Sequence, residues 1–266
     1  MREYFESDKF FETASTLSQA LQTNESHFLH VAQFAVKANL PMLNDQALAQ
    51  EMVLNGAKIH SHILFAKLEY QQGRYLKSQN YLNEALVLSP QSEEVWALIG
   101  NLCFFQKKYR EAKSAYETVL ASTKSILEGD KKSLVLSRLG YIYLSEAYVT
   151  EPLDPFAVLT PAQKSFMESQ ALFAKDIYIS ACKLNATSQT WLGVGRSCFM
   201  LGQYADAENS LSEANVLNPR DSYVWINLAL LCLVQDRISE ANQSLKQALR
   251  IGIDDTRTLR FFSPYV

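Results

Sequence analysis

The sequence predicts an all-α fold in which helical hairpins stack in a row. Three observations support this prediction: a fixed period along the chain, helical spacing of apolar and small residues within each period, and turn residues between the two halves. Trp191 and Trp225 are 34 residues apart, as are Cys198 and Cys232. A repeat of this length is typical of helical solenoids, in which each hairpin buries its apolar face only against its neighbours.

Each unit contains two predicted helices. In the unit 188–221 the first helix carries a stripe at intervals of three and four residues, formed by Trp191, Val194, Gly195 and Cys198. After the turn LGQY a second stripe follows, formed by Ala207, Leu211 and Ala214. The small residues predict that the two helices approach each other closely.

The period divides most of the chain into five units. These are 59–92, 93–126, 133–187, 188–221 and 222–255, and the third carries an insertion at about 148–173. In that unit Leu136, Leu139, Gly140 and Tyr143 predict a first helix after the spacer LEGDKK. Thr160, Pro161 and Gln163 form a helix-start signal, which predicts an overlong second helix from 161 to about 184.

The two ends of the chain depart from the repeat. Residues 1–58 predict degenerate helical hairpins that cap the N-terminal end, and they open on a half-repeat, which suggests a fragment of a longer protein. Residues 256–266 predict a capping tail over the last hairpin.

The stretch Gly193-Val194-Gly195 raises an alternative interpretation as a glycine-rich nucleotide loop. Such a loop needs a preceding strand and a tight turn into a helix N-terminus. Here both glycines fall in the middle of a predicted helix, and Gly195 occupies the position that Gly100 and Gly140 take in other units. We therefore expect packing glycines and no nucleotide.

The composition and the remaining motifs favour a non-enzymatic, soluble intracellular protein. The net charge of −3, with acidic and basic residues mixed, argues against nucleic acid as a partner. No apolar run reaches the roughly 20 residues of a membrane span. The four cysteines form no CxxC pair, the four histidines provide no metal site, and no catalytic motif is present. We expect no catalytic residues, no cofactor and no metal.

The pattern W-x2-L/V-G-x2-C/Y…A-x3-L/Y-x2-A…P resembles the tetratricopeptide repeat (TPR). The resemblance implies a right-handed superhelix whose first helices line a concave groove for partner helices or peptides. Carried over to this chain, the expected groove residues are Lys67, Tyr70, Asn101, Phe104, Phe105, Arg138, Tyr141, Leu144, Leu192, Arg196, Phe199, Met200, Ile226 and Leu230. The alternative is that individual residues of this set only pack between adjacent first helices.

A second resemblance concerns 188–235, best in "TWLG", "LSEAN" and "VW–LAL–CL". This segment is similar to the C-terminal repeats of a cilia- and flagella-associated axonemal protein family. The resemblance implies a scaffold in the cytoplasm and the ciliary or flagellar axoneme, with axonemal proteins such as dynein-arm or central-apparatus subunits as partners. Self-association stays open, and the alternative function is a cytosolic TPR co-chaperone or trafficking adaptor.

Overall fold

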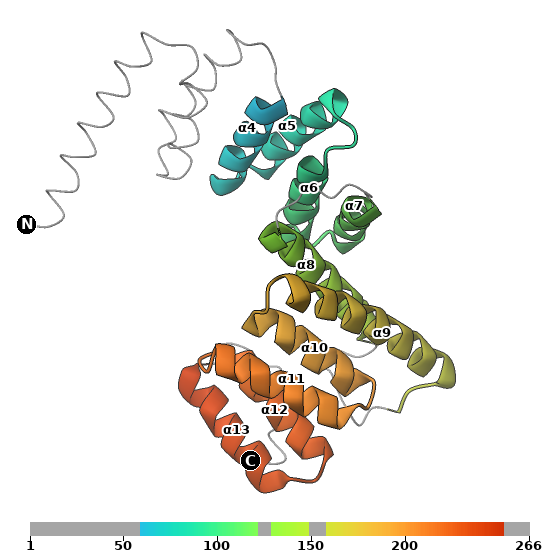
Figure 1. Cartoon of the computed structure of the whole chain (residues 1–266), viewed down its shortest axis with the longest axis vertical. Helices are drawn as coiled ribbons and strands as arrows, with labels where there is room; N and C mark the ends of the chain where they lie inside the picture. The colour runs from blue at the N-terminus through green and yellow to red at the C-terminus, as the bar shows by residue number, and fades with distance from the viewer. Residues whose placement is uncertain (1–58, 122–128, 149–157, 253–266) are drawn as a thin grey trace, which may run out of the picture. The chain divides into compact units, whose positions relative to one another are not determined.

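The computed structural model describes residues 59–121, 129–148 and 158–252, and within them it is entirely helical (Figure 1). The helices are α4 (Ile59–Gln71), α5 (Tyr75–Leu88), α6 (Glu93–Phe105), α7 (Tyr109–Ala121), α8 (Gly129–Ala147), α9 (Pro161–Leu184), α10 (Ser188–Met200), α11 (Tyr204–Leu217), α12 (Ser222–Val234) and α13 (Ile238–Ile251). The all-α prediction is confirmed. The predicted cap 1–58 and tail 256–266 lie outside the described residues.

The described helices belong to two compact units, which divide between Lys108 and Tyr109. In the first unit α4 pairs with α5, and α5 also packs on α6. Leu82 and Ala85 of α5 are fully buried, and the Ser78 hydroxyl donates a hydrogen bond to the Ala66 carbonyl at 2.7 Å. This contact draws the two antiparallel helices together along their small residues.

The second unit contains three consecutive hairpins, α8 with α9, α10 with α11, and α12 with α13. Each hairpin packs on the next, through α9 on α10 and α11 on α12. The first helices α8, α10 and α12 are also neighbours in this order. Burial follows the predicted stripes, since Ala207, Leu211 and Ala214 of α11 are all at most 1% exposed.

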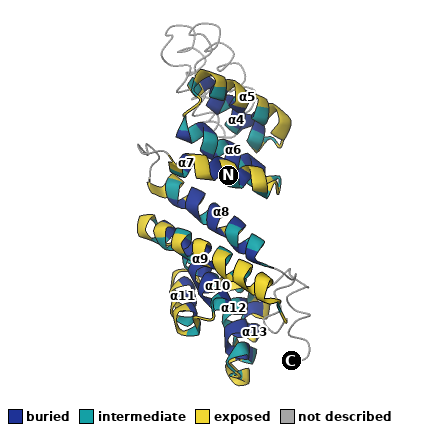
Figure 2. Ribbon diagram, turned by 90° about the vertical axis from the view of Figure 1, so that its right-hand side faces the viewer, coloured by how far each residue is buried: buried dark blue, intermediate teal, exposed yellow. Residues whose placement is uncertain are grey.

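The overlong helix α9 begins where its sequence signal predicts. Thr160 accepts a hydrogen bond from the Gln163 backbone N–H through its hydroxyl, and the Gln163 side chain accepts from the Thr160 backbone N–H. This reciprocal capping box satisfies two backbone donors that a helix N-terminus leaves unpaired. The first turns of α9 are largely exposed to solvent, as the yellow ribbon of Figure 2 shows.

The start of α8 differs from the prediction. Residues 129–132 were expected to be part of a spacer, but they form the first turn of α8. Asp130 lies in this turn, where a negative charge favours the positive end of the helix dipole, and it also accepts a hydrogen bond from the Asn185 side chain at 3.0 Å. The helix therefore begins at Gly129, before the repeat pattern does.

Both glycines of the Gly193-Val194-Gly195 stretch lie inside α10, as predicted. A Cβ atom added to Gly195 would lie 2.7 Å from Cγ of Leu211, and one added to Gly193 would overlap the ring of Tyr178. No strand precedes them in the described chain. These glycines therefore allow close helix packing, and the nucleotide-loop interpretation does not apply.

Candidate partner-binding face

The predicted binding residues of the first unit form an ion pair and an aromatic cluster. Lys67 of α4 lies 3.0 Å from a carboxylate oxygen of Glu94 on α6, so its charge already has a carboxylate partner within the chain. The aromatic cluster consists of Tyr70, Tyr75, Phe104 and Phe105, whose neighbouring ring centroids lie 5.6 to 6.1 Å apart. Phe105 is 54% exposed. Asn101 is partly buried on the same helix as Phe104.

In the second unit the predicted residue Arg196 of α10 contacts Tyr148, which directly follows the last residue of α8. Its guanidinium donates a hydrogen bond to the hydroxyl of Tyr148, and its Cζ lies 5.3 Å from the centroid of the same ring. Burial by itself lowers the pKa of Arg196, but the hydroxyls of Tyr148, Tyr178 and Tyr141 offset this effect, and the net shift is upward. Arg196 therefore stays charged at any physiological pH.

Side chains with some exposure accompany Arg196 on these first helices. Tyr141 of α8 is 40% exposed and its ring centroid lies 6.2 Å from that of Tyr109. Phe199 of α10 is partly buried, with its ring centroid 6.0 Å from that of Tyr204. We call the set of Tyr141, Arg196 and Phe199, together with Tyr148 directly after α8, the first-helix face of the second unit. Arg138, also predicted, is partly buried on α8.

Several predicted groove residues are buried and do not present a surface. Leu144 is only 1% exposed, and the others are at most 8% exposed: Leu192, Met200, Ile226 and Leu230. Leu144, Leu192 and Met200 belong to one core cluster, and Ile226 and Leu230 belong to another. Their burial leaves little surface for a partner, and their role in a binding groove stays a prediction. They pack between helices, which is the alternative that the sequence left open.

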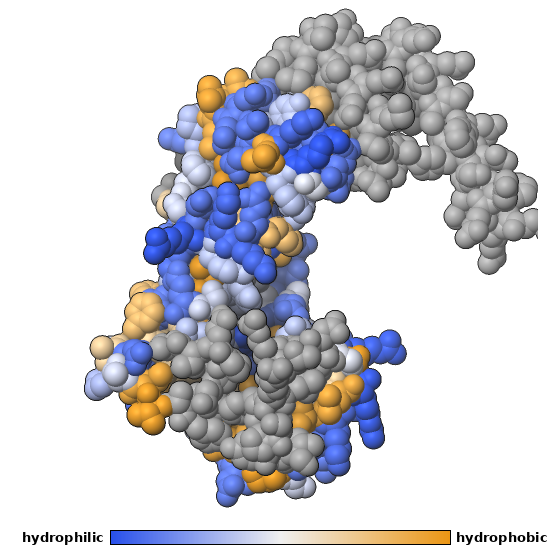
Figure 3. All heavy atoms as spheres, turned by 180° about the vertical axis from the view of Figure 1, so that it is seen from behind, coloured by the Kyte–Doolittle hydropathy of each residue, from blue (hydrophilic) through white to orange (hydrophobic). Residues whose placement is uncertain are grey.

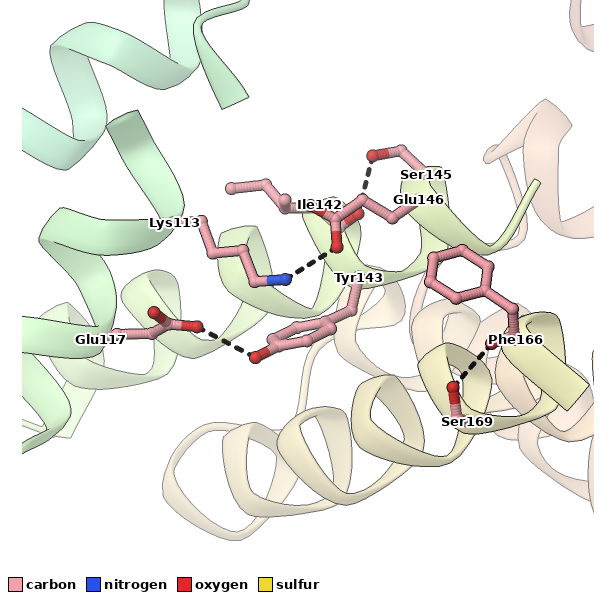
Figure 4. Close-up of polar contacts among 8 residues, drawn as sticks. All are labelled: Lys113, Glu117, Ile142, Tyr143, Ser145, Glu146, Phe166 and Ser169. Atoms are coloured by element: carbon pink, nitrogen blue, oxygen red, sulfur yellow. Dashed lines mark hydrogen bonds and ion pairs between the residues drawn. The ribbon is translucent and has the colours of Figure 1, made fainter. Parts of the chain in front are cut away.

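A contact between α7 and α8 was not anticipated from the sequence (Figure 4). The Tyr143 hydroxyl donates to a carboxylate oxygen of Glu117 at 3.0 Å, and the Lys113 ammonium lies 3.9 Å from the centre of the same ring. Lys113 also pairs with Glu146 at 2.7 Å. Burial, followed by the hydrogen bond to Glu117, raises the pKa of Tyr143 to about 12. These contacts join α7 to α8.

The described residues offer little reactive chemistry. The four cysteines form no disulfide, and burial raises the pKa of Cys182, Cys198 and Cys232, so their thiols stay protonated. No group of three or more potential metal ligands occurs in the part of the chain that the structure describes. His62 is buried, with Nε2 3.1 Å from a Glu84 carboxylate oxygen. None of the described helices combines the length and the apolar character of a membrane span.

On the side of the molecule that Figure 3 draws, the described surface is mostly hydrophilic, and hydrophobic side chains form separate patches. The exposed apolar residues lie on second helices as well as on first helices, for example Val216 on α11, which is 75% exposed. Exposure alone therefore does not select a binding face. The first-helix face is distinguished by a partly buried cation, Arg196, whose side-chain partner is a tyrosine and not a carboxylate.

Comparisons with known proteins agree with the repeat pattern. Residues 12–263 match the family described as "Cilia and flagella-associated protein 70 C-terminal domain". The human cilia- and flagella-associated protein 70 is 29% identical over 234 residues, which are 87% of this chain and 19% of that protein. The Macaca fascicularis protein of the same name is 33% identical over 134 residues, 50% of this chain and 11% of that protein. The chain thus spans about a fifth or less of these relatives.

Solved structures of TPR proteins share the fold. Pseudomonas aeruginosa pilF superimposes with a TM-score of 0.69 at 13% identity, covering 90% of this chain and 97% of that one. YrrB, described as a TPR protein with an unusual peptide-binding site, gives a TM-score of 0.60 at 17% identity, covering 80% and 96%. The chain is a TPR-type α-solenoid, and it belongs to the family of cilia and flagella-associated protein 70 C-terminal domains.

Proposed function

We propose that this chain is a non-enzymatic scaffold of the motile cilium or flagellum axoneme, which binds partner proteins through its first helices. The observation that carries the proposal is the pairing of Arg196 with Tyr148 beside the half-exposed ring of Tyr141. Aromatic and arginine side chains contribute most to binding energy at protein interfaces, since they combine apolar area with directional hydrogen bonds. The family, and the TPR fold with its typically non-enzymatic members, support the same proposal.

The partners we propose are axonemal proteins, with dynein-arm and central-apparatus subunits as candidates. We expect a partner to bind as a helix or an extended peptide segment laid along the first helices. Both are common ways in which a folded protein recognises a peptide. YrrB, whose description mentions a peptide-binding site, supports the idea that this fold can present such a surface.

Retention on detergent-extracted axonemes tests this proposal. The tagged chain is expressed in ciliated cells, and the axonemes are washed in steps of increasing salt. A scaffold subunit is expected to stay with the axoneme through low-salt washes and to leave only at high salt or with stronger treatment. Release of the chain together with the soluble fraction contradicts the axonemal role and favours the co-chaperone or adaptor alternative.

A further inference from the structure

Arg196 differs in its side-chain partner from three other partly buried cations of the described chain, Lys67, Lys113 and Arg237. Lys67, Lys113 and Arg237 each lie within 3.0 Å of a carboxylate oxygen, from Glu94, Glu146 and Glu208 respectively. Arg196 instead has Tyr148 as its side-chain partner, and none of the ion pairs formed among the described residues includes it. Its positive charge is therefore not neutralised within the part of the chain that the structure describes.

A partly buried guanidinium without a carboxylate partner, such as that of Arg196, is unusual in a protein. A guanidinium has five N–H donors, and one phenol oxygen accepts only a small share of them. Removing a cation from water is costly unless hydrogen bonds and an opposite charge compensate. The neighbouring groups are Tyr141 on α8, Tyr148 directly after α8 and Tyr178 on α9. They supply hydroxyl oxygens and ring faces but no formal negative charge at neutral pH.

The residues around Arg196 also leave it accessible to a partner. Arg196 keeps part of its surface exposed, and Tyr141 of the neighbouring first helix is 40% exposed. Phe199, at i+3 on α10, adds an aromatic side chain one turn away. A carboxylate that approaches from this face can accept two parallel N–H bonds from a guanidinium, and an apolar neighbour of that carboxylate can contact the rings.

We propose that Arg196, held by Tyr148, is the recognition site for an acidic side chain of the partner, an Asp or Glu adjacent to an apolar residue in the bound segment. This inference rests on the proposed function, because it names the chemistry of the partner at the same face. It differs from a clamp on a chain-terminal carboxylate, since one guanidinium among aromatic rings selects a side-chain carboxylate beside an apolar group.

A library of random twelve-residue peptides displayed on phage provides the probe. The full 266-residue chain is immobilised, and the selected peptides are sequenced. We expect enrichment of Asp or Glu at one position next to an apolar residue. For a selected peptide, replacing that acid with its amide is expected to weaken binding to the wild-type chain about tenfold or more.

The same pair of peptides is then measured on Arg196→Gln. We expect the acidic and amide peptides to bind this variant with affinities within about threefold of each other, because the cation that distinguishes them is gone. Arg196→Lys, which keeps the charge without the planar fork, is expected to retain part of the preference, and it replaces Arg196→Gln if the latter does not fold. Circular dichroism establishes the fold of each variant.

Two outcomes overturn the inference. Selected peptides without an enriched acid, or an acid preference that is unchanged in Arg196→Gln, mean that Arg196 has a purely structural role. If the selected peptides nevertheless bind Tyr141→Ser more weakly than the wild-type chain, the first-helix face remains a binding surface. In that case only the recognition of an acidic side chain by Arg196 is contradicted. Failure to select any peptide contradicts both the inference and peptide binding at this face.

Discussion

The ring of Tyr178 lies directly against Gly193, so that a Cβ atom on Gly193 would be 2.2 Å from Cε1 of Tyr178. The other edge of the same ring faces Gly140, where an added Cβ would be 2.7 Å away. One residue of α9 thus occupies the space that two glycines leave on α8 and α10. Tyr178 is only 5% exposed, and its position explains why both first helices carry glycine.

Gly193→Ala tests this packing because helix propensity and overpacking change the free energy of unfolding in opposite directions. Alanine stabilises a helix interior by about 0.8–1 kcal/mol relative to glycine, whereas overpacking a close contact costs about 1–3 kcal/mol. We expect a net loss in the free energy of unfolding, measured by urea denaturation. Gly129→Ala is the control, since nothing lies within 4 Å of its added Cβ, and it is expected to be neutral or slightly stabilising. A stabilised Gly193→Ala variant contradicts the packing role.

Gly195→Leu tests the corresponding contact within one hairpin. The added side chain meets Leu211 of α11, whose Cγ would lie 2.7 Å from the new Cβ. We expect a loss of about 1–3 kcal/mol in the free energy of unfolding, again from overpacking. Thermal and urea unfolding measure it, and a loss below about 0.5 kcal/mol would contradict tight packing of Leu211 against Gly195.

The two capping boxes are expected to respond differently to the same substitution. Thr160→Ala removes the cap of α9, whose first turns are mostly exposed, so we expect local fraying with little change in global melting. Thr187→Ala removes the cap of α10, a helix buried along most of its length, and we expect a loss of about 1 kcal/mol in global stability. Amide hydrogen exchange and thermal melting separate the two effects. Equal losses in global stability would contradict this distinction.

Tyr143→Phe tests the contact between α7 and α8. The substitution removes the hydrogen bond to Glu117 and keeps the ring beneath Lys113 and beside Phe173. We expect a loss of about 0.5–1.5 kcal/mol in the free energy of unfolding, the usual net contribution of one hydrogen bond. Glu117→Gln, which keeps an oxygen acceptor, is expected to lose less. A larger loss in Glu117→Gln than in Tyr143→Phe contradicts this assignment.

Glu69 makes the stability of the first unit depend on pH. Its hydrogen bonds to the Arg74 side chain hold the pKa of Glu69 below the ordinary value of 4.5, against the opposing effect of burial. The ionised form is thus stabilised by folding, and this contribution is present above pH 4.5 and is lost as the pH falls through the folded-state pKa. We expect Glu69→Gln to show a smaller decrease in melting temperature below pH 4.5 than the wild type. Parallel profiles would contradict the role of this pair.

Much of the fold follows from the sequence because local and repeating signals agree. The 34-residue spacing between Trp191 and Trp225 predicts the last two hairpins, and the Thr160–Gln163 capping box predicts the start of α9. The first turn of α8 was missed because the repeat pattern begins later than the helix does, and the Asp130–Asn185 contact joins residues far apart in sequence.

The candidate site was less accessible to sequence reasoning. The repeat places side chains on one helix face but does not tell which of them neighbouring helices cover, so Leu192 and Leu230 were expected at a surface and are buried. The Tyr148–Arg196 contact spans 48 residues across the insertion, where the repeat register breaks. Only the arrangement of α8 beside α10 brings these two side chains together.

The central claim is that the chain binds its axonemal partners through the first-helix face. Binding of the chain to salt-stripped axonemes, measured as a saturation curve, tests this claim most directly. The claim predicts that Tyr141→Ser, on the first-helix face, weakens binding about tenfold. Val216→Ser, the control at an exposed apolar residue of the second helix α11, is expected to leave binding unchanged. Both variants must melt like the wild type. Equal binding by Tyr141→Ser and the wild type, or selective loss in Val216→Ser, would contradict the claim.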